Sequence, residues 1–192
     1  DIVTQHAKTL SVPDGWCLVN NFKDQFRPQA IAVSDGKAIR FSKSMNKLIE
    51  NLAKDLPSAF ESKPYLKRLS VIKKRYSDKQ NQLFQKIEKF AEDKNLQIVK
   101  SENEFETIPV VDGKPLTTED FTNLSKRKKT EIEENIRLIQ SQIAIASVEV
   151  DKLTSALHTD VEKLMDETTL SVVKSRLQKI RSEFQDNRDI LT

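Results

Sequence analysis

The feature that most constrains this chain is a run of apolar residues between Ile132 and Leu164, spaced three or four positions apart. A spacing that averages about 3.5 residues places an apolar seam along one side of a long helix. Within this series one position, Asp160, is polar. So narrow a seam has to be buried against another helix, and the sequence therefore predicts a protein built around a coiled coil. The apolar positions of the seam are Ile132, Ile136, Ile139, Ile143, Ala146, Val150, Leu153, Leu157 and Leu164.

The composition agrees with a long helical protein. Of the 192 residues, 32% are charged and only three are Gly, and few Gly residues favour long helices. The net charge of +3 is close to neutral and gives no strong indication of nucleic acid or an anionic membrane as a partner. Cys17 is the single cysteine, which excludes an internal disulfide and is typical of a reducing compartment. No apolar run reaches the roughly 18 residues that span a bilayer, and no secretory signal is recognisable.

A second, weaker seam precedes the first. Its apolar residues recur every seven positions within a helix that we expect from about residue 62 to 95. The helix of the first seam is expected to begin at Thr117, where Asp120 completes an approximate capping box, and to weaken at residues 166–169 before a last amphipathic helix. Short connections favour antiparallel neighbours, so the two seams are expected to face each other. The positions of the second seam are Leu69, Tyr76, Leu83 and Phe90, flanked by Leu66, Ile72 and Ile87.

Strand signals occur in two places. Trp16–Phe22 is interpreted as a short buried strand and Ala30–Val33 as a second strand, while β-prone residues at about 96–112 predict a small hairpin between the two seams. A helix is expected from Phe41, with Ser42 as its N-cap and Pro57 ending or bending it. The expected fold class is mainly α: a long antiparallel helical coiled-coil hairpin with a small β hairpin at its tip and short strands near the N-terminus.

The residues that support catalysis or metal binding are sparse. His6 and His158 are far apart in sequence, so a zinc site is not expected. Gly36 lacks the second glycine of a phosphate loop, and Ser58 has neither a glycine-lined oxyanion site nor a matched base. We predict no catalytic, cofactor-binding or metal-binding residue in this chain. The basic cluster Lys126–Lys129, echoed at residues 73–75, is interpreted as a solvated helix surface, with phosphate binding as the weaker alternative.

The expected hairpin carries the candidate protein-binding residues. β hairpins with exposed apolar side chains can take up extended peptide by strand addition. The alternative is that these side chains only pack the hairpin onto the coiled coil. The candidates are Leu96, Ile98, Val99, Phe105, Ile108, Val110 and Val111.

Three segments together resemble a known family. PDGWCLVNNF with RPQAIAV, LPSAFESKPY and PVVDGKPLTTEDF are similar to a region of Lon-like ATP-dependent proteases with a helical insertion in their AAA+-like module. The family pattern resembles D-W-C-Y-V-N-N-F followed by a strand and a G-x-G turn. Here Leu18 replaces the aromatic residue, and only Gly36 remains of the turn. The resemblance makes Trp16, Asn20, Asn21 and Phe22 structural motif residues.

The resemblance implies a parent protein larger than this chain. Residues 1–40 would be a fragment of the AAA+-like core, and residues 41–192 the helical arm. The ATP-site loop would lie upstream of Asp1 and the Ser-Lys protease dyad downstream of Thr192, so no catalytic residue is carried over and no cofactor is expected in this fragment. The parent would be a bacterial cytoplasmic ATP-dependent serine endopeptidase that assembles as a ring, a hexamer. Some relatives have lost ATP hydrolysis, so ATP use by the parent stays open.

The expected function is that of a non-catalytic helical arm that gates or binds unfolded protein substrates and supports ring assembly. One alternative is a coiled-coil scaffold or oligomerisation protein without a link to proteolysis. Another is nucleic-acid binding through Lys126–Lys129, which would weaken steeply with salt. The pattern alone leaves open whether the two seams pair within one chain or between chains.

Overall fold

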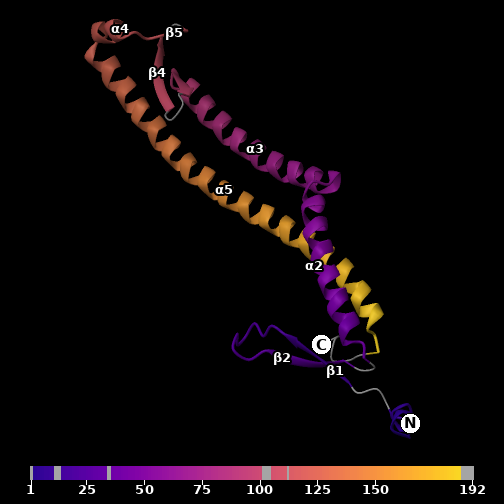
Figure 1. Ribbon diagram of the computed structural model, residues 1–192. Helices are drawn as coiled ribbons and strands as arrows, with labels where there is room; N and C mark the ends of the chain where they lie inside the picture. Colours follow the sequence, from indigo (N-terminus) through magenta and orange to yellow (C-terminus); the bar gives the residue numbers. More distant parts are fainter. Residues whose placement is uncertain (1, 11–13, 34–35, 101–104, 112, 187–192) are drawn as a thin grey trace. The chain divides into compact units, whose positions relative to one another are not determined.

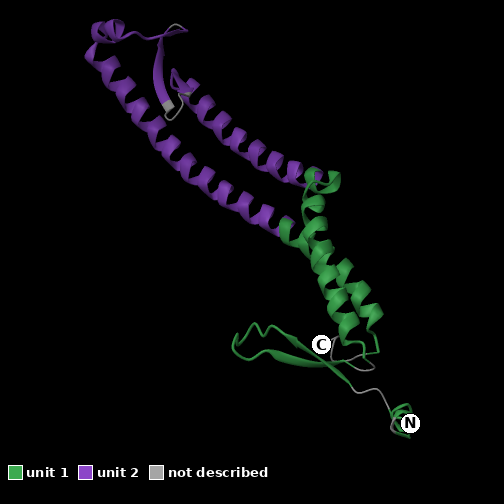
Figure 2. Ribbon diagram, in the orientation of Figure 1, with its two compact units in different colours: residues 1–66, 165–192 green, residues 67–164 purple. Residues whose placement is uncertain are grey.

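The computed structural model describes residues 2–10, 14–33, 36–100, 105–111 and 113–186 (Figure 1). They form two compact units, drawn in different colours in Figure 2: unit 1 contains residues 1–66 and 165–192, and unit 2 contains residues 67–164. The helices α3 (Lys63–Glu92) and α5 (Lys126–Glu183) each contribute to both units. Long helices with small antiparallel hairpins confirm the predicted mainly α fold class.

The β hairpin of unit 1 is covered on one face. Strand β1 (Gly15–Val19) pairs antiparallel with β2 (Gln29–Val33), and the short helix α1 (Ile2–Ala7) precedes them. Cys17 of β1 packs against the helical core of the unit, whereas Trp16 and Leu18 remain 68% and 72% exposed. The prediction of a buried strand over residues 16–22 was therefore wrong. A two-stranded sheet that packs on helices through one face leaves alternate side chains in solvent.

Gly15 allows β1 to approach helix α2 (Ala38–Phe60) closely. A Cβ atom built on Gly15 would lie 2.6 Å from the Cβ atom of Ala38, the first residue of α2. That separation is far below an ordinary contact between carbon atoms. A side chain at this position would therefore force the strand and the helix apart.

Helix α2 differs from its predicted bounds at both ends. It begins at Ala38 after Lys37, so the expected cap Ser42 lies inside the helix and was wrongly assigned. Pro57 does not end the helix, which continues to Phe60. A proline removes one backbone donor, and here the loss falls in the last turn of the helix, where few further bonds depend on it.

The core of unit 1 is the antiparallel pair formed by α2 and the end of α5. The rings of Phe41 and Phe184 meet edge to face with their centroids 5.3 Å apart. Glu183 Oε1 accepts a hydrogen bond of 2.6 Å from Arg40 Nε. At the other end of α2, Asp55 binds the guanidinium of Arg176, and this hydrogen bond raises the pKa of Arg176. The buried residues of this core are Phe41, Leu48, Ile180 and Phe184.

Helix α5 is longer than expected and starts later. Thr117 caps the short helix α4 (Thr118–Asn123), where its Oγ1 atom accepts from the backbone N–H of Asp120 at 3.2 Å. The chain leaves helical geometry at Leu124, and α5 then runs without interruption through residues 166–169. The predicted start of this helix at Thr117 and its weakening at residues 166–169 were wrong. Polar residues are tolerated inside a helix where packing on either side stabilises it.

A small antiparallel sheet belongs to unit 2 and confirms the hairpin predicted at about residues 96–112. Over the described residues its strand order is β3 (Leu96–Lys100), β4 (Phe105–Val111) and β5 (Lys114–Pro115). The backbone N–H of Val110 donates to the carbonyl of Asn95 at 2.8 Å. Pro109 has no N–H, and its carbonyl faces β5, where it accepts from Leu116 at 2.7 Å. Leu96 anchors the sheet by packing against Ala91 of α3 and Ile139 of α5.

Candidate binding surface on unit 2

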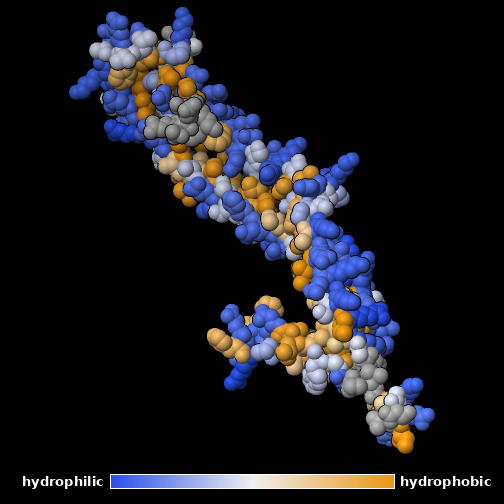
Figure 3. All heavy atoms as spheres, in the orientation of Figure 1, coloured by the Kyte–Doolittle hydropathy of each residue, from blue (hydrophilic) through white to orange (hydrophobic). Residues whose placement is uncertain are grey.

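The two predicted seams meet within one chain. Every position of the first seam from Ile132 to Leu164 is buried or half-buried, and Ile139 is fully buried. On α3, Tyr76 is buried, and the other heptad positions of the second seam are half-buried. The flanking residue Leu66, however, is 49% exposed and does not join the seam. Figure 3 shows apolar residues along the middle of unit 2, bordered by hydrophilic outer surfaces.

The polar position of the first seam has a specific partner in the second. Tyr76 Oη donates a hydrogen bond of 2.7 Å to Asp160 Oδ2, and the guanidinium of Arg75 binds the same carboxylate. The hydrogen bond from Tyr76, with the positive charge of Arg75, lowers the pKa of Asp160. The same hydrogen bond raises the pKa of Tyr76. Asp160 of α5 is therefore paired with side chains of α3, and the break in the apolar pattern has a structural cause.

This contact predicts that the stability of unit 2 depends on pH in two ranges. The lowered pKa of Asp160 means that its carboxylate stabilises the fold above about pH 4, and this contribution is lost as the pH falls through the lowered value. The raised pKa of Tyr76 means that its neutral phenol stabilises the fold below about pH 10, and this contribution is lost as the pH rises through the raised value.

We expect Asp160→Asn to flatten the acidic part of this pH dependence, because an amide does not titrate. Urea unfolding followed by circular dichroism between about pH 7 and pH 3 measures the effect, and the wild-type chain should lose more stability over that range than the variant. Asp151→Asn is the matched control, since Asp151 is exposed on the same helix. Equal pH dependence of wild type and Asp160→Asn would contradict the assigned role of Asp160.

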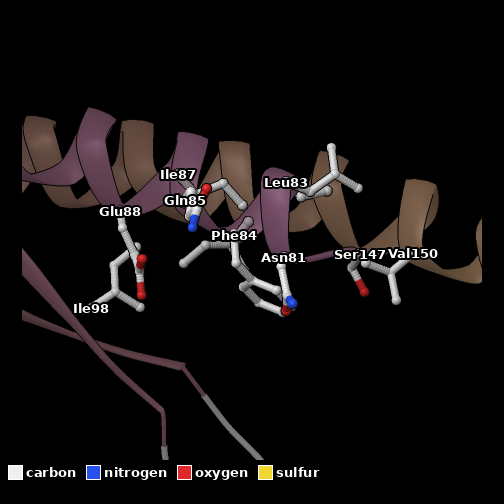
Figure 4. A pocket seen from close by; sticks show the side chains of 11 residues that line it. Asn81, Leu83, Phe84, Gln85, Ile87, Glu88, Ile98, Ser147 and Val150 are labelled. Atoms are coloured by element: carbon white, nitrogen blue, oxygen red, sulfur yellow. The ribbon is translucent and has the colours of Figure 1, made fainter. Parts of the chain in front are cut away.

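A cavity of about 450 Å³ opens between the two helices of unit 2 (Figure 4). It lies where the small residue Ala146 takes a position of the seam that elsewhere, apart from Asp160, carries Ile, Val or Leu. Its wall includes Ile98 of strand β3, so helix and sheet both contribute. This volume is within the range of ligand-binding pockets. The apolar lining residues are Leu83, Phe84, Ile87, Ile98, Ile143, Ala146 and Val150, and the polar ones are Asn81, Gln85, Glu88 and Ser147.

The candidate residues of the hairpin differ in burial. Leu96 is 2% exposed and belongs to the core, and Ile98 packs beside it and lines the cavity. Val99 and Val111 are 38% and 37% exposed. Ile108 and Val110 are half-buried, and the side chain of Phe105 lies outside the described residues. Among the candidates whose side chains are described, Ile98 lines the cavity, while Leu96 is closed to a partner in this conformation.

The basic clusters make contacts within the chain. Lys129 Nζ donates to the carbonyl of Thr122 at 2.6 Å, which links the end of α4 to the start of α5, and Arg75 binds Asp160. His158 is exposed on α5. Over the described ranges, no group of three or more His, Cys, Asp or Glu residues is placed to hold a metal ion. In the same part of the chain, no helix has the length and apolar character that crossing a membrane requires.

The motif segment of unit 1 forms β1, β2, the loop between them and the first part of α2. In that loop, the Asn21 side chain accepts from the backbone N–H of Lys23 and donates to the carbonyl of Arg27, each at 3.0 Å. Asn21 therefore shapes the turn that joins the strands. Asn20 follows β1 and is exposed, and Phe22 is 94% exposed.

Residues 16–48 match the family model described as the Lon-like LonC helical domain. Residues 16–48 therefore form a Lon-like segment. The match starts at the Trp16 of the motif and ends at Leu48 of α2, so it covers the β hairpin of unit 1 and half of its helical core. Among curated proteins, no match to the chain is found. The similarity to Lon-like proteases rests on this segment, and the matched family model is a helical domain of such proteases.

The cavity was not recognised as a site from the sequence. The signal that could have found it is Ala146, the smallest side chain in a seam of larger apolar residues. A small residue at one such position leaves space unless the facing helix fills it. Whether it does so depends on how the two helices align, and a single seam does not define that alignment.

Proposed function

We propose that this Lon-like chain is the non-catalytic helical arm of an ATP-dependent serine protease, and that unit 2 binds unfolded polypeptide for degradation elsewhere in the parent protein. The observation that carries the proposal is the Lon-like match at residues 16–48, joined in one chain to a helical unit whose apolar seam opens into a cavity. A protease arm of this kind needs apolar surface to retain unfolded chains, because these expose side chains that a folded protein buries.

The wider properties of the parent protein belong to the same proposal. Residues 1–40 are a fragment of its AAA+-like core, and its Ser-Lys dyad lies outside this chain. The parent acts in the bacterial cytoplasm as a hexameric ring, with ATP as the candidate cofactor. Four large apolar side chains of β1 and the loop after it are 68–94% exposed and support association: Trp16, Leu18, Phe22 and Phe26. Exposed apolar groups of this size are common where protein surfaces meet.

Binding of an unfolded protein tests the proposal directly. Fluorescein-labelled casein, which has little fixed structure, is titrated with the chain, and fluorescence anisotropy reports complex formation. We expect saturable binding of casein and none of a labelled folded protein such as ubiquitin. A coiled-coil scaffold would instead associate with itself and leave casein free, and that result would overturn the proposed function.

A further inference from the structure

We propose that the cavity around Ala146 receives apolar side chains of an extended peptide segment that adds as a strand beside β3. The inference rests on the proposed function and deepens it, because it names the binding site and the class of segment bound. Three observations support this occupant: the shape and lining of the cavity, the free edge of the neighbouring strand, and the charge on the rim.

The cavity is suited to apolar side chains. Seven of its described lining residues are apolar, and they come from α3, α5 and β3. Ile98 and Glu88 lie at the same end of the cavity in Figure 4. A volume of about 450 Å³ is far larger than the packing gaps of a normal coiled coil, in which knobs fill holes. Transfer of an apolar side chain from water to this site would bury apolar surface on both partners.

The strand beside the cavity has an edge that can pair. Within the described part of the chain, β3 is bonded to β4 on one side only. The bond from Val110 to Asn95 makes this pair a hydrogen-bonded one, so the backbone groups of Gln97 and Val99 also face β4. The N–H and carbonyl of Ile98 therefore point away from β4. An added strand would bond to these groups while its alternate side chains face one direction, as strand addition requires.

The rim of the cavity favours one kind of charge. Glu88 is the charged residue among the described lining residues, and it is exposed. A Lys or Arg next to the apolar residues of the peptide would interact favourably with this carboxylate. The preferred segment is therefore extended, apolar and flanked by a basic residue.

A variant that fills the cavity tests whether the peptide binds there. Ala146→Leu places a larger side chain in the cavity, and Ala144→Leu is its matched control because Ala144 is exposed on the same helix outside the cavity. The probe is a fluorescein-labelled peptide of alternating Ile and Thr with a terminal Lys. We expect Ala146→Leu to weaken binding about ten- to a hundredfold, as loss of one buried apolar side chain implies, and Ala144→Leu to bind like wild type. A peptide with Glu in place of the terminal Lys should bind more weakly than the Lys peptide to the wild-type chain and to Ala144→Leu.

A second measurement does not depend on the folding of Ala146→Leu. In a Cys17→Ser background, Ser147→Cys places an environment-sensitive dye on the rim of the cavity, and Ala144→Cys places it outside. The peptide should change the emission of the dye at residue 147 and leave that at residue 144 unchanged. A change at residue 147 on raising the protein concentration alone would identify a second copy as the occupant and overturn the inference.

The outcomes separate the two proposals. If the wild-type chain fails to bind casein, the proposed function fails. If casein binds, but Ala146→Leu binds casein and peptide as wild type does and the dye at residue 147 does not respond, the cavity is not the site. The inference then falls, and the proposed function stands.

Discussion

Ile139→Ala should lower the free energy of unfolding of unit 2 by about 2–5 kcal/mol, the usual cost of removing most of a fully buried aliphatic side chain. Ile139 is 0% exposed and packs with Ala91 and Leu96, so its loss leaves a void where α3, α5 and the sheet meet. Urea unfolding measures the total change. Hydrogen exchange with mass spectrometry should show the loss of protection within residues 67–164.

Leu138 offers a control for this variant one position away. Its side chain is 50% exposed, so Leu138→Ala removes a similar apolar group from the surface of the same helix. We expect a change within about 0.5 kcal/mol for a surface substitution of this kind. Similar losses in the two variants would show that the face of α5 assigned to the core is wrong.

Phe184→Ala should destabilise unit 1 by about 3–5 kcal/mol, the range for removal of a buried aromatic ring. Phe184 is 3% exposed and makes the edge-to-face contact with Phe41. Removal of this ring eliminates its buried apolar area and also its edge-to-face interaction with Phe41. Hydrogen exchange should report the loss in α2 and at the end of α5, where the partners of Phe184 lie.

Phe26→Ala is the matched control in the same unit, because the ring of Phe26 is 94% exposed. The two variants make the same chemical change at sites that differ in burial. We expect Phe26→Ala to leave the stability of the chain almost unchanged. A large loss in Phe26→Ala, measured on the same chain, would mean that the ring is covered in solution.

The heptad patterns predicted the helical pairing of unit 2 well. The spacing correctly predicted which face of α3 is buried, and this face carries Leu69, Tyr76, Leu83 and Phe90. A narrow apolar stripe is removed from water only when its own face packs against another element. The hairpin between the seams was also found, since Leu96 and Ile98 stand in a β-prone segment between two helical patterns.

The ends and partners of the helices were predicted less well. Thr117 is a good cap, but it caps α4, because sequence signals mark a helix start without stating how long the helix is. The exposure of Trp16 was missed because an apolar strand of that composition is compatible with one covered face or two. The pairing of α2 with the end of α5 joins residues more than a hundred positions apart, and local periodicity carries no such information.

Of the candidate site, sequence analysis found Ile98 but not the cavity beside it. The cavity is a property of two helices and one strand together, and Ala146 alone does not reveal it. Asp160 was visible as an interruption of the pattern, whereas its partners Tyr76 and Arg75 became known only from the fold.

The contact between Tyr76 and Asp160 has a consequence for how the two helices of unit 2 choose their alignment. Apolar stripes that repeat every seven residues can slide by one repeat and still bury similar surfaces. Such a slip would set the Asp160 carboxylate beside Leu69 or Leu83, and neither of these side chains can replace the phenol of Tyr76 as a donor. A carboxylate that loses a hydrogen-bond donor is less well compensated, so this contact favours the observed alignment over shifted ones that the apolar residues alone would accept equally.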